Sequence, residues 1–237
     1  MIDFHSHILP GIDDGSDSPE TSLEMLVRER EQGVELVCLT PHFYADYTTP
    51  ERFFRHRAGA FDALRRAMDE SGEAFPLLRL GAEVRFFDGI SNASILDDLC
   101  LEGTNLLLLE MPFASWSDRM VSEVGELCRR GLQPVAAHIE RYFGLASKKT
   151  MRRFLSLDIL VQSNAEFFLS RRTSRKALRM LRDGQIHFLG SDAHNLTSRA
   201  PNLGGAWSLV SKQLGAGAIE RLEDYESLVV AESEAFT

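Results

Sequence analysis

Cysteine is scarce in this chain of 237 residues, and long apolar runs are missing from it. The three cysteines, Cys38, Cys100 and Cys128, are odd in number and far apart, which excludes a disulfide framework and favours buried free thiols in a reducing compartment. No segment approaches the roughly 20 apolar residues of a membrane helix, and the first residues lack the basic and apolar regions of an export signal. We therefore expect a cytoplasmic protein without membrane insertion.

Positive charge is also limited, with 26 Lys and Arg against 35 Asp and Glu and a formal net charge of −9. This excludes a protein that depends on a broad basic face, so nucleic acid is not an expected partner, although a local group of arginines could still bind one anion. The remaining composition is that of an ordinary globular protein, and self-association is compatible with it. We expect one domain over residues 1–237, with a flexible tail after about residue 225.

Seven short runs rich in Leu or β-branched residues recur along the chain, and stretches of helical periodicity lie between them. The runs are typical of buried parallel strands and cover residues 2–5, 34–40, 76–83, 105–110, 133–138, 158–164 and 185–194. The expected helices cover residues 19–32, 50–71, 116–130, 148–157 and 173–183. This alternation predicts an α/β fold and favours a distorted (β/α)7 barrel similar to a TIM barrel over an open sheet.

Side chains that can bind a metal ion fall almost entirely where these strands end. In a parallel barrel the strand ends converge on one face, so five of the seven histidines are predicted to meet carboxylates there. His56, in a helical stretch, and His187, at the start of a strand, are expected to lie elsewhere. The candidates are His5, His7, Asp13 or Asp14, His42, Glu83, Glu110, His138, Asp192 and His194.

Each of these signals is weak when taken alone. A lone His-x-His pair has about one chance in three of binding metal, and a single buried histidine or carboxylate is more often a hydrogen-bonded structural residue. Together they are more specific, because so many such groups at one place would cause severe desolvation and repulsion unless cations neutralised them. The sequence therefore predicts a metal cluster.

Five segments, HSHILPGIDDG, TPH, GAE, AHIERY and SDAHN, resemble motifs of the PHP (polymerase and histidinol phosphatase) superfamily of metal hydrolases. The chain is most similar to the bacterial manganese-dependent tyrosine-protein phosphatases of capsule and exopolysaccharide loci, and the resemblance extends from Ile2 to about Arg199. It implies a phosphoric monoester hydrolase that removes phosphate from phosphotyrosine with a metal-activated hydroxide. The implied partner is a bacterial tyrosine kinase that controls polysaccharide synthesis.

The resemblance further implies three divalent metal ions, with Glu83 bridging two of them. The three implied ligand sets are His5, His7, Glu83 and Asp192; Glu83, Glu110 and His138; and Asp14, His42 and His194. Spacing alone does not choose between Asp13 and Asp14, so that position stays open. Imidazole and carboxylate ligands suit manganese, iron or zinc, and manganese is the ion that the resemblance implies.

Arg141 and Arg199 correspond, by the same resemblance, to arginines that bind the phosphate. No protein nucleophile is then required, and a cysteine nucleophile is excluded independently. The cysteine phosphatase loop needs an arginine six positions after its cysteine, and those positions hold Tyr44, Leu106 and Pro134. The segment QSNAEFF departs from the family pattern around Glu166, which leaves the substrate preference open.

Aromatic residues are frequent near the strand ends and are able to hold a phenyl ring, although about half of them are expected to pack in the core. They are Phe43, Tyr44, Tyr47, Phe86, Phe87, Phe113, Trp116, Tyr142 and Phe143. Two alternatives stay open. The same metal site would also suit a small-molecule phosphatase of the histidinol-phosphate kind or a nucleotide phosphoesterase. The second alternative is a metal-stabilised binding protein without catalytic turnover. The complete ligand set and both arginines argue against it.

Overall fold

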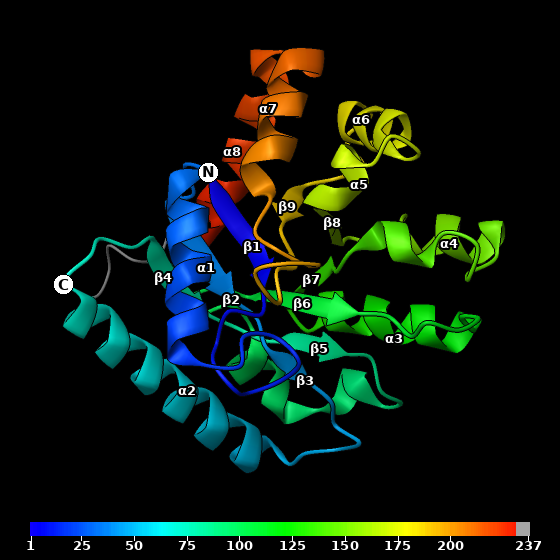
Figure 1. Cartoon of the computed structure of the whole chain (residues 1–237). Helices are drawn as coiled ribbons and strands as arrows, with labels where there is room; N and C mark the ends of the chain where they lie inside the picture. The colour runs from blue at the N-terminus through cyan, green and yellow to red at the C-terminus, as the bar shows by residue number, and fades with distance from the viewer. Residues whose placement is uncertain (231–237) are drawn as a thin grey trace.

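The computed structural model describes residues 1–230 as an α/β fold with parallel strands at its centre and helices around them (Figure 1). The first sheet has the order β1 (Ile2–Ser6), β2 (Leu36–Leu39), β4 (Leu77–Leu80). The second has the order β3 (His42–Phe43), β5 (Glu83–Arg85), β6 (Leu106–Glu110), β7 (Gln133–Ala136), β8 (Leu160–Asn164), β9 (Phe188–Gly190). All of these strand pairs are parallel, which confirms the predicted α/β class.

The two sheets follow one another because two of the predicted strands are interrupted. Pro41, which has no N–H to donate, separates β2 from β3. Gly81 and Ala82 separate β4 from β5, and a Cβ at Gly81 would lie 3.2 Å from the Leu101 side chain. The expected (β/α)7 barrel is therefore found as a curled parallel sheet in two parts.

Backbone hydrogen bonds also connect β1 to the segment that follows β9. Asp192 N donates to His5 O at 2.8 Å, and His7 N donates to Ala193 O at 2.9 Å. The first strand is thus fixed on one side by β2 and on the other by the last strand segment. This arrangement places the residues after β1 next to the residues after β9.

Helices begin at the positions that their capping residues dictate. Ser18 and Thr49 accept hydrogen bonds from the first turns of α1 (Pro19–Glu31) and α2 (Pro50–Ser71), and each helix starts with proline. The other three predicted helices are α3 (Asp118–Arg129), α4 (Lys148–Phe154) and α6 (Ser174–Arg182). The sequence did not predict α5 (Ala165–Leu169), α7 (Leu203–Leu214), α8 (Ala216–Val230) or the 3-10 turns η1 (Ile90–Asn92), η2 (Ser94–Leu99) and η3 (Ile139–Tyr142).

An apolar cluster lies on the face of the strands that also carries the polar site. Leu106, Leu108 and Glu110 of β6 share one face, because alternate residues of a strand point the same way. The two leucines pack in a cluster with Phe4 and Phe188, whose rings stack with centroids 4.1 Å apart. Apolar side chains on the same face of the sheet therefore lie next to Glu110.

The start of the expected tail needs correction, since α8 continues to Val230. Val229 is fully buried, and Glu226 is 8% exposed and accepts a hydrogen bond from Ile2 N at 2.9 Å. Residues 226–230 are therefore helical and pack through Glu226 and Val229, while positions 231–237 of the expected tail lie outside the described residues. Within residues 1–230, no helix is long and apolar enough to cross a bilayer. The cysteines are free, with Cys38 and Cys100 buried as predicted and Cys128 partly exposed.

Glu226 gives the folded protein a pH-dependent stability. Burial raises the pKa of Glu226 to about 7, so the folded state binds this proton more tightly than the unfolded chain does. Its contribution is fully present below the ordinary carboxyl pKa and is lost as the pH rises through 7. We predict that Glu226→Gln reduces the fall in unfolding free energy between about pH 5 and pH 8 by about 1–3 kcal/mol in urea denaturation.

The matched control is Glu220→Gln, which removes an exposed carboxylate from the same helix and should leave the pH profile of the wild type. If Glu226→Gln and the wild type lose stability equally over this range, the proposed role of burial at Glu226 is wrong.

Candidate metal centre

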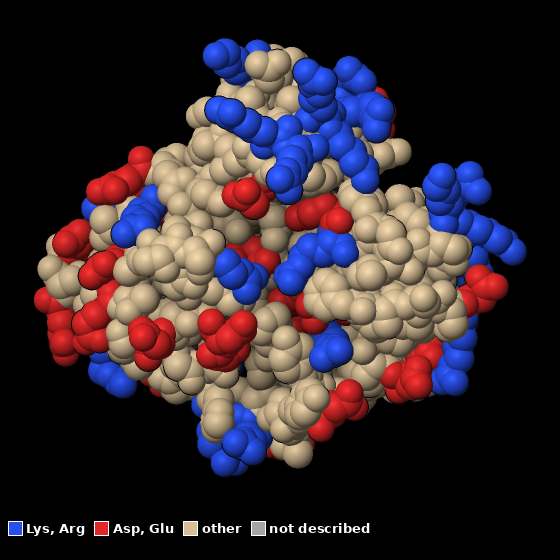
Figure 2. All heavy atoms as spheres, turned by 45° about the vertical axis from the view of Figure 1, so that its right-hand side comes forward, with Lys and Arg blue, Asp and Glu red and all other residues tan. Residues whose placement is uncertain are grey.

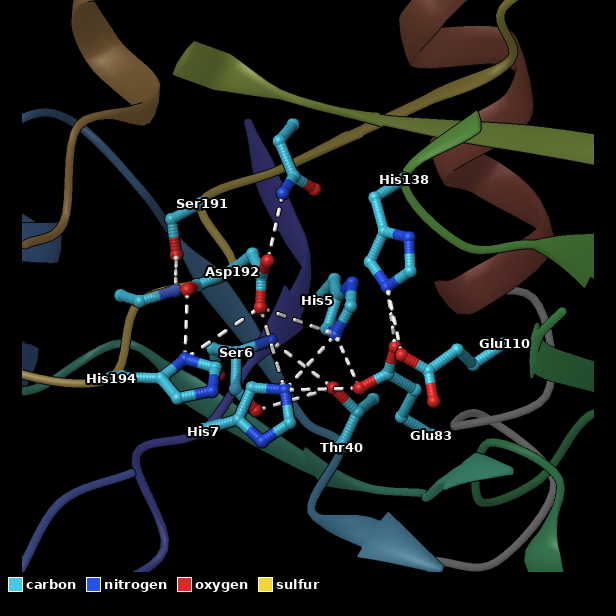
Figure 3. Close-up of polar contacts among 12 residues, drawn as sticks. His5, Ser6, His7, Thr40, Glu83, Glu110, His138, Ser191, Asp192 and His194 are labelled. Atoms are coloured by element: carbon cyan, nitrogen blue, oxygen red, sulfur yellow. Dashed lines mark hydrogen bonds and ion pairs between the residues drawn. The ribbon is translucent and has the colours of Figure 1, made fainter. Parts of the chain in front are cut away.

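The nine predicted ligand residues meet at the carboxyl ends of the strands, and Figure 3 labels seven of them. His5 lies in β1 and His7 directly follows that strand, while His42, Glu83 and Glu110 belong to β3, β5 and β6. His138, Asp192 and His194 come from the segments that follow β7 and β9, and Asp14 comes from the loop before α1. Side chains from strands distributed across both sheets therefore lie close together in one site.

Glu83 occupies the centre of this volume and is only 1% exposed. Its Oε2 lies 3.3 Å from His5 Nε2, 3.3 Å from His7 Nε2 and 2.9 Å from His42 Nδ1. Its Oε1 accepts a hydrogen bond from His138 Nε2 at 2.7 Å. One buried carboxylate thus contacts four imidazoles, and Figure 3 shows three of them, His5, His7 and His138.

Three further carboxylates surround this centre. Asp192 Oδ1 lies 3.7 Å from His5 Nε2, 3.5 Å from His7 Nε2 and 3.6 Å from His194 Nδ1. Asp14 Oδ1 lies 3.4 Å from His42 Nε2 and 3.5 Å from His194 Nε2. Glu110 Oε1 lies 3.6 Å from His138 Nε2.

Three groups of these side chains have ligand atoms that all lie within 4.8 Å of one another. They are His7, Asp14, His42 and His194; His5, His7 and Glu83; and His42, Glu83 and Glu110. Nitrogen and carboxylate oxygen donors in such groups suit divalent transition metals. The groups overlap with the three sets that the family resemblance implies, but they differ in two ways. His7 and His42 each belong to two groups, and the predicted ligands His138 and Asp192 belong to none.

Two imidazole nitrogens of the cluster lack the hydrogen-bond partners that burial demands. They are His138 Nδ1 and His194 Nε2, and both are buried. His5 Nε2 and His7 Nε2 face each other at 3.1 Å. A buried polar atom without a partner costs about 1–3 kcal/mol, and cations among these atoms would accept their lone pairs. The residues present therefore fit metal ions.

The protonation equilibria reflect the crowding of charge. Burial lowers the pKa of His194 to about 4. Burial also lowers the pKa of His7, but hydrogen bonds with Asp13 and Glu83 outweigh it and raise that pKa to about 10. Burial and the nearby Glu83 carboxylate raise the pKa of Glu110 to about 7. A divalent cation would reverse the last effect, because it favours ionised carboxylates and neutral imidazoles.

Asp13 and Asp14, which spacing alone could not tell apart, have different environments. Asp13 Oδ2 accepts hydrogen bonds from His7 Nδ1 at 2.8 Å and from His42 N at 3.0 Å, so Asp13 orients the His7 ring. Asp14 is exposed and belongs to one of the three groups. The turn requires Gly15, since a Cβ there would lie 2.1 Å from His7 O.

His138 and Asp192 have strained backbones. They are the two non-glycine residues with positive φ within residues 1–230, at 30° and 53°. Such conformations cost about 1–3 kcal/mol and persist where the surroundings impose them. His138 N donates to Gln162 Oε1 at 2.6 Å, and Asn164 Nδ2 donates to Asp192 Oδ2 at 2.8 Å. Both strained residues are predicted ligands, and β8 anchors each of them.

Sequence reasoning did not identify these supporting residues. Gln162 and Asn164 are polar residues at alternate positions of β8, so they share one face of the strand, and that spacing was an available signal. Asp3 gave no signal of this kind, because its role depends on a residue 188 positions away. Its two carboxylate oxygens accept hydrogen bonds from Ser191 N at 2.8 Å and Ser191 Oγ at 2.5 Å, which ties β1 to the loop that carries Asp192.

Arg141 and Arg199 converge on Asp192 at the edge of the cluster. Arg199 Nη2 lies 2.7 Å from Asp192 Oδ1, and Arg141 Nη1 lies 3.7 Å from Asp192 Oδ2. The two arginines line a cavity of about 300 Å³ together with Asn164 and Glu166. This cavity, called here the arginine cavity, has two guanidinium groups in its lining that can donate to an anion, and the carboxylates of Glu166 and Asp192 also line it.

A second cavity, of about 490 Å³, opens beside Asp14 and His42. Tyr44 and Tyr47 line it; the Tyr44 ring stacks on His42 at 4.9 Å and Tyr47 is 77% exposed. Several other aromatic residues of the predicted rim are buried instead: Phe43, Phe86, Trp116 and Tyr142. His56 is exposed, and His187 Nδ1 accepts a hydrogen bond from Val161 N, so neither joins the groups around Glu83.

Comparison with known proteins is consistent with this geometry. The tyrosine-protein phosphatase CpsB of Streptococcus pneumoniae is 28% identical over 233 residues, which cover 94% of this chain and 94% of that protein. YwqE of Bacillus subtilis (strain 168), also named a tyrosine-protein phosphatase, is 26% identical over 251 residues and covers 100% of this chain and 94% of its own length.

A solved structure and a family description agree with these relatives. One chain from the crystal structures of Bacillus subtilis YwqE and Streptococcus pneumoniae CpsB, described as unique metal-dependent tyrosine phosphatases, superposes with a TM-score of 0.82 and 25% identity. The match covers 98% of this chain and 96% of the other. The family described as "Capsular polysaccharide synthesis, CpsB/CapC" matches residues 1–227. This chain therefore belongs to the CpsB/CapC family.

Proposed function

We propose that this protein is a metal-dependent protein-tyrosine phosphatase. The observation that carries the proposal is the meeting of a buried cluster of imidazoles and carboxylates around Glu83 with two arginines at its edge. Relatives named tyrosine-protein phosphatases, and a structural neighbour described as metal-dependent, support the same activity. The reaction is the hydrolysis of a phosphoric monoester.

We infer that the cluster binds three divalent ions, most simply manganese, and that Glu83 bridges two of them. Asp14 rather than Asp13 is a ligand, because Asp13 is engaged with His7 and the backbone of His42. When bound, the ions supply an acidified water as the nucleophile and positive charge opposite the phosphoryl oxygens. We also infer that the two parts of the sheet act as one distorted seven-stranded barrel, since β1 is bonded on both sides.

The arginines bind the phosphoryl group of the substrate. Arg199 and Arg141 now contact Asp192, and their planar donors match two phosphoryl oxygens once a phosphate enters the arginine cavity. The leaving tyrosinate has an ordinary pKa of about 10, so it needs little assistance from a protein acid. Tyr44 and Tyr47 offer aromatic surface for the phenyl ring.

The physiological substrate is, on this proposal, a phosphorylated bacterial tyrosine kinase that controls polysaccharide synthesis. The capsular polysaccharide description of the family supports that setting. A substrate panel separates this reading from the histidinol-phosphate and nucleotide alternatives, because only a tyrosine phosphatase should prefer phosphotyrosyl peptides.

Metal removal tests the first part of the proposal. We predict that exhaustive chelation abolishes hydrolysis of a phosphotyrosyl peptide and that added manganese restores it. His138→Ala should lower the metal content per chain, and it should lower kcat by at least about 100-fold. Loss of a residue that only hydrogen-bonds to a metal ligand already lowers metal affinity or activity about 10–100-fold, and loss of a ligand should lower them more. Atomic emission and phosphate release are the measurements.

His56→Ala is the control, since this histidine is exposed, whereas His138 is buried against Glu83 and Glu110. It should keep the metal content of the wild type. Full activity after complete removal of metal would exclude the proposal.

A second prediction concerns phosphate binding. Arg141→Ala should lower kcat/KM by about 100- to 1000-fold, as the loss of one donor to a developing charge does in other enzymes. Its metal content should not change, because its contact with the cluster is the one to Asp192 at 3.7 Å.

Arg66→Ala, which removes an exposed arginine from α2, is the matched control and should retain wild-type kcat/KM. Equal kcat/KM in Arg141→Ala and the control would show that Arg141 does not bind the phosphate.

A further inference from the structure

Basic side chains are concentrated on one part of this acidic protein. Between residues 148 and 182 there are ten Lys and Arg but only two acidic residues, Asp158 and Glu166. The ten, called here the basic surface, come from α4, α6 and the segment between α5 and α6. They are Lys148, Lys149, Arg152, Arg153, Arg171, Arg172, Arg175, Lys176, Arg179 and Arg182.

Most of this charge is not neutralised within the chain. Arg153 pairs with Asp118 at 2.9 Å and Arg182 with Asp183 at 3.4 Å, and across residues 1–230 the other eight have no carboxylate at ion-pair distance. Figure 2 shows blue side chains gathered above and to the right of the hollow at the centre of the molecule. Like charges held this close repel one another, so an anionic partner would be favoured there.

An apolar cavity of about 410 Å³ lies within the basic surface. Its apolar lining comes from Phe143, Ala146 and Met151, and its basic lining from Lys148, Arg152 and Lys176. Lys176 Nζ lies 3.1 Å from the centre of the Phe143 ring. The cavity therefore combines an apolar floor with a cationic rim.

This cavity lies near the arginine cavity, because residues close together in the chain line the two. Arg141 lines the arginine cavity and Phe143 lines the apolar one, so their Cα atoms are at most about 7 Å apart. Phe143 also contacts Phe167 at 6.0 Å, and its neighbour Glu166 lines the arginine cavity. A peptide whose phosphotyrosine lies at Arg141 would reach the apolar cavity within two or three extended residues.

We propose that the basic surface and its apolar cavity bind the part of the substrate that flanks the phosphotyrosine, and that this part is an acidic segment with an apolar side chain. The inference rests on the proposed function, which places the phosphate at Arg141 and Arg199. The cationic rim attracts the acidic residues and speeds their encounter, while the floor buries the apolar side chain. An anionic bilayer would also be attracted, but a concave cavity lined by Phe143, two residues after Arg141, suits a peptide.

Three phosphotyrosyl peptides of equal length test the proposal. The first has Asp and Glu around a Leu close to the phosphotyrosine, the second has Ser in place of each acidic residue, and the third has Gly in place of Leu. The variant is Arg152→Glu with Lys176→Glu, and the matched control is Arg65→Glu with Arg66→Glu in the exposed face of α2. Each protein is also assayed on p-nitrophenyl phosphate, which is too small to reach the basic surface.

We expect the metal-loaded wild type to hydrolyse the first peptide with kcat/KM roughly tenfold above the second at low salt, within the range of electrostatic steering. The third peptide should lie below the first, since it leaves the apolar floor uncovered. The preference for acidic residues should disappear in Arg152→Glu with Lys176→Glu, persist in the control, and shrink at about 1 M salt. Hydrolysis of p-nitrophenyl phosphate should be equal in all three proteins.

The outcomes that overturn the inference are distinct from failure of the proposed function. If the wild type hydrolyses p-nitrophenyl phosphate but treats the peptides alike, or if the double variant keeps the preference, the inference is wrong and the phosphatase proposal stands. Cosedimentation with phosphatidylserine vesicles without any peptide preference would also overturn it, in favour of a membrane surface. Absence of hydrolysis of all four substrates by metal-loaded wild type would instead contradict the proposed function.

Discussion

The burial of the Glu83 carboxylate among four imidazoles is the constraint on which the rest of the site depends. Such a group is stable only if charge and hydrogen bonds compensate it, and two nitrogens of the surrounding imidazoles, His138 Nδ1 and His194 Nε2, lack hydrogen-bond partners among the described residues. Parallel strands meet this demand because their ends bring donors from distant parts of the sequence to one place. The strained backbones of His138 and Asp192 complete the arrangement.

Charge is arranged in layers around that centre. Carboxylates and imidazoles form the innermost group, and Arg141 and Arg199 stand at its edge. Beyond them lies the basic surface, although the chain as a whole carries a net charge of −9. An anionic group approaching the cluster would therefore meet positive charge first, and the strongly acidic remainder of the protein would not attract it.

Much of this organisation follows from the sequence, because strand ends and helix caps are local signals. The α/β class, the five main helices and the meeting of the candidate residues were predicted, while their roles as ligands stay a prediction. The distinct positions of Asp13 and Asp14 were not predictable, since they depend on contacts with His7 and His42. The basic surface was not predicted either, because the net charge of the whole chain does not reveal a local excess of Lys and Arg.

Diffraction from crystals grown with manganese tests the central claim most directly, through the anomalous signal at the manganese absorption edge. The account predicts three anomalous peaks among the clustered ligands, two of them within about 2.5 Å of Glu83 oxygens. It also predicts Asp14, and not Asp13, beside the third. The absence of any anomalous peak next to Glu83 in protein saturated with manganese would contradict the account.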